Sequence, residues 1–361
     1  MTGDAAKGTL RKFGAVRLLA AAVIVLFAIV VVLADFIAPY DHTSQSRHAV
    51  SAPPSSIHFR RTDGSFALRP FIYQRRLADP LTQKYEEIET KQYPLELFTE
   101  GESHLLFGLI PVRTRLFGVS GLAQEAPRVY ILGTDALGRD RLSRLLVAVR
   151  FSLIVCPLGA ALACLIGVVI GMLSGYAGRL PDMIVMGAAD SMLAMPALIL
   201  ILAARAAFPL ELPPTRAALL LIIIFALTGW AGMARLTRGL VRSLREKEFV
   251  LAARSIGLTE ARILFRHVLP NAAPVLVTQG LILLPYFLLS EVALSYLGVG
   301  LQEPAPSLGN MLAAANDITQ LARQPFLLLS PAIAIFLFVL AVRVLVPDTS
   351  LRQGGPNDEA R

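Results

Sequence analysis

The sequence predicts an all-α polytopic membrane protein with six transmembrane helices and an extracytoplasmic insert that is mostly β or irregular. Hydrophobic residues make up 55% of the 361 residues and the mean hydropathy is +0.61, well above that of a soluble domain. Apolar runs long enough to cross a bilayer, roughly 20 residues each, recur along the chain. The basic excess, a formal charge of +8, gathers beside these runs. It therefore indicates contact with the lipid membrane and its anionic lipids, and no nucleic-acid partner.

The N-terminal segment, residues 1–17, is basic, and residues 18–37 form the first predicted span. Its cations are Lys7, Arg11, Lys12 and Arg17. A positive flank of this kind places the N-terminus in the cytoplasm. A cleaved signal peptide is the alternative, because Val32 and Ala34 could form a small-residue cleavage site, although the apolar run is long for such a peptide.

Residues 38–128 differ in character and predict a small extracytoplasmic domain. The segment begins with Pro- and Ser-rich linkers, and Asp63-Gly64 then separates two stretches of alternating polarity, which is typical of a β-hairpin. Its basic residues do not argue against an outside location, because long loops cross the membrane largely regardless of charge.

A turn and a helix precede the second span. Gly133, Thr134, Asp135 and Gly138 are expected to form the turn, and Arg139 and Asp140 follow it. A helix is expected from Arg139 onward, with leucines on one side and Arg141 and Arg144 on the other. From the residues alone, this helix could lie on the outer leaflet of the membrane.

Five further spans follow within a core of residues 129–361. They are residues 151–173, 183–204, 217–233, 275–294 and 326–346. Residues 295–325 are expected to form an outer loop and residues 347–361 a polar cytoplasmic tail. Two carboxylates fall within spans, Asp190 in the third, which Pro196 should kink, and Glu291 near the outer end of the fifth. An ionisable group in a span is a candidate for the transport pathway. For Asp190 the plainer alternative is a carboxyl near the inner end, hydrogen-bonded to a neighbouring helix.

Residues 235–270 form the most basic connection and are therefore predicted to be cytoplasmic. Two short helices are expected, from about Ser243 to Ile256 and from Thr259 to about Leu269. Gly257 suits the left-handed residue that ends a helix, Thr259 can cap the next one, and Pro270 should turn the chain into the fifth span. Such a hairpin could lie on the membrane surface or could dock a cytoplasmic partner.

This stretch resembles the EAA loop of importer permeases in the ATP-binding-cassette (ABC) superfamily. The positions that carry the resemblance are Leu251, Ala252, Ala253, Arg254, Gly257, Arg266, His267, Leu269 and Pro270. Two of them depart from the family pattern, with Leu251 in place of the Glu and His267 in place of the Ile. The segments LGTDALGRDRLSRLL and SLGNML are similar to stretches of the dipeptide, oligopeptide and nickel branch, in which the former lies at the outer mouth of the pore.

The resemblance implies a fold like that of type I ABC importers and a place in the bacterial inner membrane, with both termini cytoplasmic. It implies a heterodimer with a second permease subunit, two cytoplasmic ATP-binding subunits and an extracytoplasmic solute-binding protein. The implied mechanism is alternating access, with ATP and Mg²⁺ bound by the partner ATPases and no cofactor on this chain. The alternative is a stand-alone secondary transporter or channel.

Several absences support a transport role without catalysis. The sequence contains no G-x-x-x-x-G-K-[ST] stretch that could cradle ATP phosphates, and no H-E-x-x-H pair. Cys156 and Cys164 lie in one apolar span and are expected to act as small apolar fillers. We therefore expect neither a catalytic residue nor a metal site.

Overall fold

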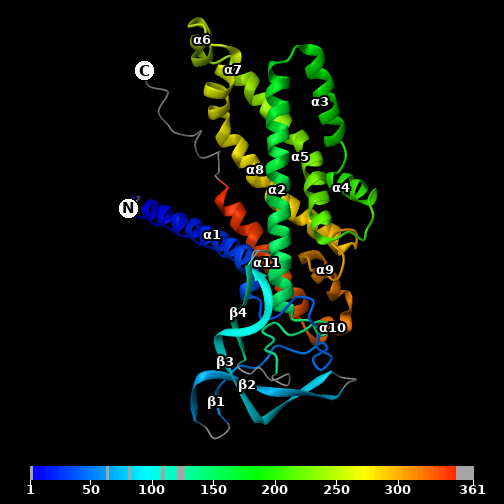
Figure 1. Cartoon of the computed structure of the whole chain (residues 1–361). Coiled ribbons are helices and arrows are strands. Elements are labelled where there is room, and N and C mark those ends of the chain that lie inside the picture. The colour runs from blue at the N-terminus through cyan, green and yellow to red at the C-terminus, as the bar shows by residue number, and fades with distance from the viewer. Residues whose placement is uncertain (1–2, 62–64, 80–82, 107–109, 120–126, 347–361) are drawn as a thin grey trace.

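The computed structural model describes residues 3–61, 65–79, 83–106, 110–119 and 127–346. A bundle of long helices occupies the centre of the molecule (Figure 1). A β insert lies at one end of the bundle and a short helical hairpin at the opposite end. The predicted class, a helical membrane protein with a β insert, is confirmed.

Helix α1, Gly3–Ile37, contains the first predicted span and packs along α2, Arg141–Tyr176, and α11, Phe326–Leu345. Phe27 meets Phe338 of α11 edge to face, with ring centroids 5.6 Å apart. Asp35 accepts a hydrogen bond from Arg150 of α2. Only 6% of the apolar window of α1 is buried, which fits a helix that faces lipid.

Helices α2 and α5, Pro214–Arg245, form the closest helix pair of the bundle (Figure 1). Four glycines of α2 make this approach possible, and their facing residues on α5 are Phe225, Met233, Ala234 and Val241. The glycines are Gly159, Gly167, Gly171 and Gly175. A Cβ atom at any of the four would come within 3 Å of α5, so a larger residue would push the helices apart. We call this contact the glycine seam.

Helix α8, Leu269–Tyr296, joins the pair through stacked aromatic rings. Phe287 of α8 lies parallel to Phe225 of α5, with centroids 4.6 Å apart and an interplanar angle of 4°. The outer connection folds into α9, Leu308–Ala313, a 3₁₀ turn, Ala314–Asn316, and α10, Ile318–Arg323. The buried core of the bundle therefore draws on α2, α4, α5, α8, α9 and α11.

The third predicted span, residues 183–204, is two helices in the structure. Helix α3, Arg179–Leu193, and helix α4, Ala197–Ala206, meet at an angle of 91°. Pro196 immediately precedes α4 and has an extended ψ of 119°, so the chain turns sharply where the sequence predicted only a kink within one helix. Among the described residues, five helices are long and apolar enough to cross a membrane, or six if the bent pair forms one span.

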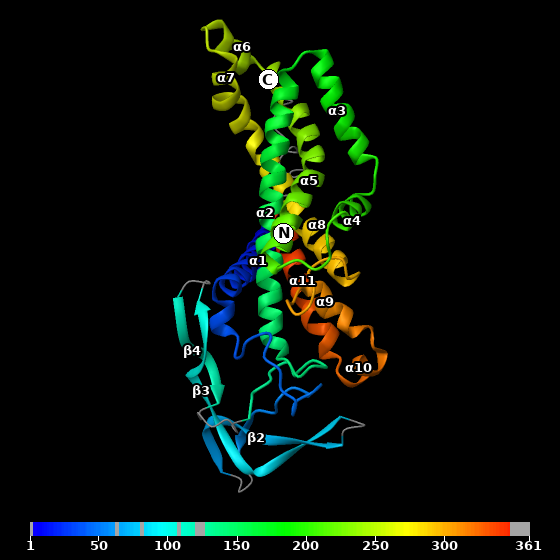
Figure 2. The same cartoon turned by 45° about the vertical axis from the view of Figure 1, so that its right-hand side comes forward.

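The insert is a curled antiparallel sheet of four strands in sequence order (Figure 2). The strands are β1, His58–Arg60, β2, Phe66–Asp79, β3, Lys84–Leu106, and β4, Ile110–Val119. The predicted hairpin corresponds to β1 and β2, although Asp63 and Gly64 themselves lie outside the described residues. The sheet is attached to the bundle through α1, because Arg115 donates a 2.7 Å hydrogen bond to the carbonyl oxygen of Ala38.

Candidate functional site

The basic hairpin begins where α5, Pro214–Arg245, ends. Helix α6, Glu248–Ser255, then runs to the Gly257 turn, and α7, Glu260–Ile263, follows. The prediction of one helix from Ser243 to Ile256 is wrong, because Lys247 is extended (φ −76°, ψ 146°) and breaks it. No residue from Arg245 to Glu248 is a helix breaker, so the break reflects packing. It lets Val250 and Ala253 turn inward onto Met172 of α2 and Val241 of α5.

Gly257 ends α6 in the left-handed conformation that the sequence predicted, with φ +83°. The amide of Leu258 donates to the carbonyl oxygen of Ala253 at 3.2 Å, and the amide of Gly257 donates to the carbonyl oxygen of Arg254 at 2.9 Å. These two bonds form a Schellman motif. Thr259 then caps α7, its hydroxyl accepting from the amide of Arg262, as predicted. Arg254 and Glu260 bridge the turn with two hydrogen bonds of 2.6 and 2.9 Å.

The hairpin has a buried face and an exposed face. Val250, Ala253 and Ile263 are buried, and Leu269 packs partly against the same cluster. Besides Glu248 and Glu260, the exposed face carries an apolar and basic surface. We call it the hairpin tip, and its members are Phe249, Leu251, Ala252, Ile256, Gly257, Arg262, Phe265, Arg266 and Pro270. Ile256 is 77% exposed and Phe265 is 62% exposed, which is unusual for large apolar side chains beside arginines.

Pro270 does not turn the chain, which corrects the sequence expectation. A π-helical turn, Leu264–Val268, joins α7 to α8, and Pro270 lies in the first turn of α8. A proline is tolerated there because the first helical amides need no intrahelical acceptor. The carbonyl of His267 instead accepts a 2.6 Å hydrogen bond from the side-chain amide of Asn271. The hairpin therefore continues directly into the long helix α8.

Two ion clusters connect α3 to α5 near the hairpin base. Asp182, which the sequence analysis overlooked, is buried and accepts from Arg238 at 2.5 and 2.6 Å and from Arg242 at 2.6 Å. Asp190 is 55% exposed and pairs with Arg235 at 3.0 Å. The plainer alternative for Asp190, a carboxyl held by a neighbouring helix, matches this contact. Two sequence features could have identified Asp182. It lies in the first turn of the predicted helix, and Arg238 and Arg242, four residues apart, fall on one face of a later helix.

The predicted outer-mouth residues form a tightly packed loop at the opposite end of the bundle. Gly133 and Gly138 both have φ +73°. A Cβ atom on Gly133 would lie 2.5 Å from the carbonyl oxygen of Ala52, so the segment before the insert packs directly on this loop. Thr134 is buried, and its hydroxyl donates to the carbonyl of Ala49 and accepts from the amide of Ala52.

Asp140 is the N-cap of α2, which begins at Arg141 rather than at Arg139 as predicted. Its carboxylate accepts from the amide and the hydroxyl of Ser143, both at 2.7 Å. The carboxyl is almost fully buried and its other oxygen has no partner among the described residues. Burial raises the pKa of Asp140 to about 6.

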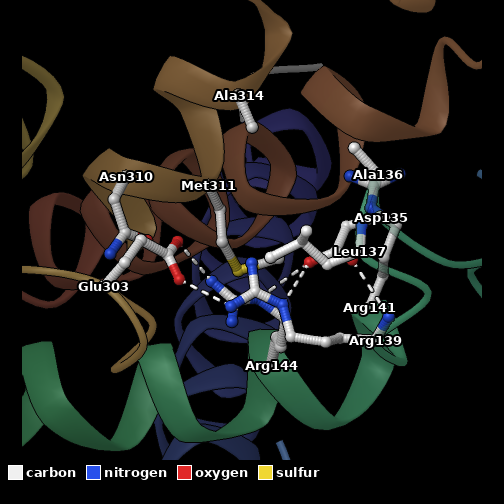
Figure 3. A pocket seen from close by; sticks show the side chains of 10 residues that line it. All are labelled: Asp135, Ala136, Leu137, Arg139, Arg141, Arg144, Glu303, Asn310, Met311 and Ala314. Carbon is white, nitrogen blue, oxygen red and sulfur yellow. Dashed lines mark hydrogen bonds and ion pairs between the residues drawn. The ribbon is translucent and has the colours of Figure 1, made fainter. Parts of the chain in front are cut away.

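A cavity of about 220 Å³ opens beside this loop (Figure 3). The loop and the first turns of α2 form one wall, and α9 with the preceding segment forms the other. Its lining residues are Asp135, Ala136, Leu137, Arg139, Arg141, Arg144, Glu303, Asn310, Met311 and Ala314. The sequence analysis treated Arg141 and Arg144 only as the polar side of a helix and did not single out Glu303.

Glu291, the second predicted pathway residue, does not line this cavity. It is fully buried in α8, where the hydroxyls of Ser152 of α2 and Ser295 donate to it at 2.7 and 2.8 Å. The carboxyl therefore joins two helices in the core. In the described part of the chain, no group of three or more His, Cys, Asp or Glu residues is placed to hold a metal ion.

Comparison with known proteins identifies the family. Residues 167–347 match the model of the binding-protein-dependent transport system inner membrane component, a range that includes the hairpin, Glu291 and α9. The oligopeptide transport system permease protein OppC of Bacillus subtilis is 36% identical over 200 residues, which is 55% of this chain and 63% of that protein.

Two further relatives extend the match. The dipeptide transport system permease protein DppC of Alkalihalophilus pseudofirmus is 35% identical over 213 residues, 59% of this chain and 67% of its own length. OppC of Mycobacterium tuberculosis is 32% identical over 243 residues, 66% of this chain and 80% of its own length. An inward-facing crystal structure of the MetNI methionine ABC transporter overlaps 56% of this chain and 92% of its own, with 20% identity and a TM-score of 0.37. The chain belongs to the family of inner-membrane components of binding-protein-dependent transport systems, in which it is a multi-pass permease subunit.

Proposed function

We propose that this chain is one of two permease subunits of an ABC importer for peptides, and that its hairpin couples the pore to cytoplasmic ATPases. The observation that carries the proposal is the hairpin tip, a basic and apolar surface at the free end of a bundle of membrane helices. The hairpin is held rigidly by the Schellman turn, the Arg254–Glu260 bridge and a small buried core. A rigid projection can transmit a push, whereas a mobile loop cannot.

The mechanism follows from this geometry. The tip would sit against the partner ATPases, which bind ATP and Mg²⁺ and close around them. Movement of the tip would pass into α5 and α8, because α6 follows α5 after two residues and α7 continues into α8. The outer ends of the helices would then separate while the inner ends approach, which is alternating access.

The proposed solute class is peptides, with dipeptides and oligopeptides as the first candidates. The support is the similarity to relatives that are oligopeptide and dipeptide transport system permease proteins. The proposed orientation places the hairpin and both termini in the cytoplasm and the β insert outside, where a solute-binding protein would dock. The basic hairpin supports this orientation. Full uptake by a chain that lacks residues 55–125 would reject a docking role for the insert.

The test is co-purification from the native membrane in mild detergent. We expect a second permease subunit and ATPase subunits to accompany the chain. Ile256→Asp combined with Phe265→Asp should remove the ATPases, because both changes place a carboxylate on the hairpin tip. Ile318→Asp is the matched control, since Ile318 is 80% exposed on α10, at the other end of the bundle. Recovery of the chain alone, as a homo-oligomer, would favour the stand-alone transporter.

A further inference from the structure

We propose that the cavity beside the outer-mouth loop is a carboxylate subsite in which Arg141 binds the terminal carboxylate of the solute. This inference rests on the proposed function for its solute class, but its chemistry comes from the cavity itself. The argument depends on which charges in the cavity wall are already paired and which one is not.

Four of the five charged lining residues neutralise one another. Arg139 donates to Asp135 at 2.6 Å and to Glu303 at 2.7 Å. Arg144 donates to the other oxygen of Glu303 at 2.7 Å and lies 3.7 Å from Asp135. Each carboxylate is therefore shared between two guanidinium groups, and the four charges sum to zero.

Arg141 is the fifth charge and has no such partner. It is 2% exposed and forms no hydrogen bond or ion pair of its own among the described residues, although the carboxylates of Asp135 and Asp140 lie near enough to attract it. Asp140, its neighbour in sequence, does not line the cavity and forms no ion pair with it; its carboxylate bonds to Ser143 instead. A buried cation without a partner is costly to a fold, so a structure that retains one is arranged for an anion that arrives from outside.

The remaining polar group of the wall is also satisfied. The side chain of Asn310 donates to the carbonyl of Ala305 at 2.9 Å and accepts from the amide of Ser307 at 2.9 Å. The rest of the lining is apolar, from Ala136, Leu137, Met311 and Ala314. The cavity thus offers one guanidinium without a hydrogen-bonded partner, in a wall whose other charges are paired and whose remainder is apolar (Figure 3).

These features select the anion. A guanidinium matches a planar carboxylate with two parallel hydrogen bonds. A volume of about 220 Å³ lies below the usual range for a whole ligand, roughly 300–1,000 Å³. The cavity therefore suits one end of a solute, a terminal residue with its carboxylate, while the rest of the molecule remains outside.

The experiment measures binding to the whole transporter complex in lipid nanodiscs, without the solute-binding protein, by isothermal titration calorimetry. The probes are trialanine, which carries a terminal carboxylate, and trialanine amide, which lacks it. We expect trialanine to bind about 10–100 times more tightly than the amide, the range of a charged hydrogen bond. Arg141→Gln should abolish this preference, and Arg141→Lys should keep part of it. Arg216→Gln, the same charge change at an exposed site on α5, should leave the preference intact.

A second measurement separates binding from a purely structural role. Without ligand, the Arg141→Gln complex should melt at the same temperature as the wild type or higher, because the substitution removes an unpaired buried charge. A clearly lower melting temperature would make Arg141 a structural residue and overturn the proposal. Equal binding of the acid and the amide, or inorganic phosphate binding as tightly as trialanine, would overturn it as well. A complex that does not import peptides but still prefers trialanine to trialanine amide through Arg141 would support the subsite. The same result would refute the proposed solute class.

Discussion

Replacement of Gly257 tests the coupling role of the hairpin through backbone conformation alone. No atom of the described residues lies within 4 Å of a Cβ added at this glycine, so the added carbon itself meets no steric obstacle there. The φ of +83° is the only obstacle. The series Gly257→Asn, Gly257→Ala and Gly257→Val therefore changes the cost of one dihedral angle while the contacts of the hairpin stay the same.

The magnitude follows from that angle. For an L-residue the left-handed backbone conformation costs about 1–2 kcal/mol of free energy. This cost is lower for Asn than for Ala, and it is higher for the β-branched Val. A cost of this size lowers the population of the Schellman turn by a factor of about 5–30. The small buried core of the hairpin, Val250, Ala253 and Ile263 on Met172 and Val241, has little free energy to offset it.

The assay is ATP-driven uptake of a labelled peptide by the reconstituted complex, with the amount of inserted chain measured beside it. Uptake should fall in the order wild type, Asn, Ala, Val, while membrane insertion stays constant. Gly239→Ala is the matched control, because Gly239 lies inside helix α5 and also has no atom within 4 Å of an added Cβ. There the same methyl group should be neutral or slightly stabilising.

Two results would refute the reasoning. Wild-type uptake by Gly257→Val would mean that the left-handed turn is not needed for coupling. Uptake lost equally in Gly257→Asn and Gly257→Val would mean that a partner touches this position, so that any side chain clashes whatever its φ preference.

Four further substitutions, at three buried carboxylates, test the polar contacts. Asp182→Asn should lower the free energy of unfolding by about 2 kcal/mol in detergent, because its two arginine partners lose a charged acceptor; an unchanged melting curve would contradict this. Glu291→Leu should cost about 1–3 kcal/mol, since two buried serine hydroxyls lose their acceptor, and Glu291→Gln should cost less; equal losses would argue against the hydrogen bonds. The folded-state pKa of Asp140, about 6, lies above its ordinary value of 3.8, so folding favours the protonated form. The associated stability is complete below pH 3.8 and is lost as the pH rises through 6, by about 3 kcal/mol. Asp140→Asn should flatten this part of the denaturation profile, and parallel profiles for both proteins would refute the assignment.

The features that were predicted correctly from the sequence are those determined by neighbouring residues along the chain. Apolar runs marked the membrane helices, and the left-handed Gly257 and the Thr259 cap followed from residue chemistry at single positions. The hairpin of β1 and β2 followed from alternation and a turn dipeptide in the same way.

The errors arose where packing between distant segments decided the outcome. The break at Lys247 exists because two side chains of α6 reach α2 and α5, and nothing near Lys247 signals it. Pro270 was expected to turn the chain, but a π-helical turn places it where a proline does no harm. The cavity was missed for a similar reason. Glu303 and Arg139 are 164 residues apart, and only the folded outer connection brings them together.

The glycine seam determines which parts of the molecule can move as one piece. It fixes α2 to α5 from Gly159 to Gly175, on the hairpin side of Pro157, whereas Arg141 and Arg144 lie on the other side of that proline. The 36 residues of α2 extend about 54 Å, so a tilt of only about 5° displaces one end by about 5 Å relative to the other. The seam thus joins α2 and α5 into one rigid unit on the hairpin side of Pro157, and α2 continues from that unit to the arginine-lined cavity. A small rotation at the hairpin end would therefore displace the cavity end of α2 by several ångströms.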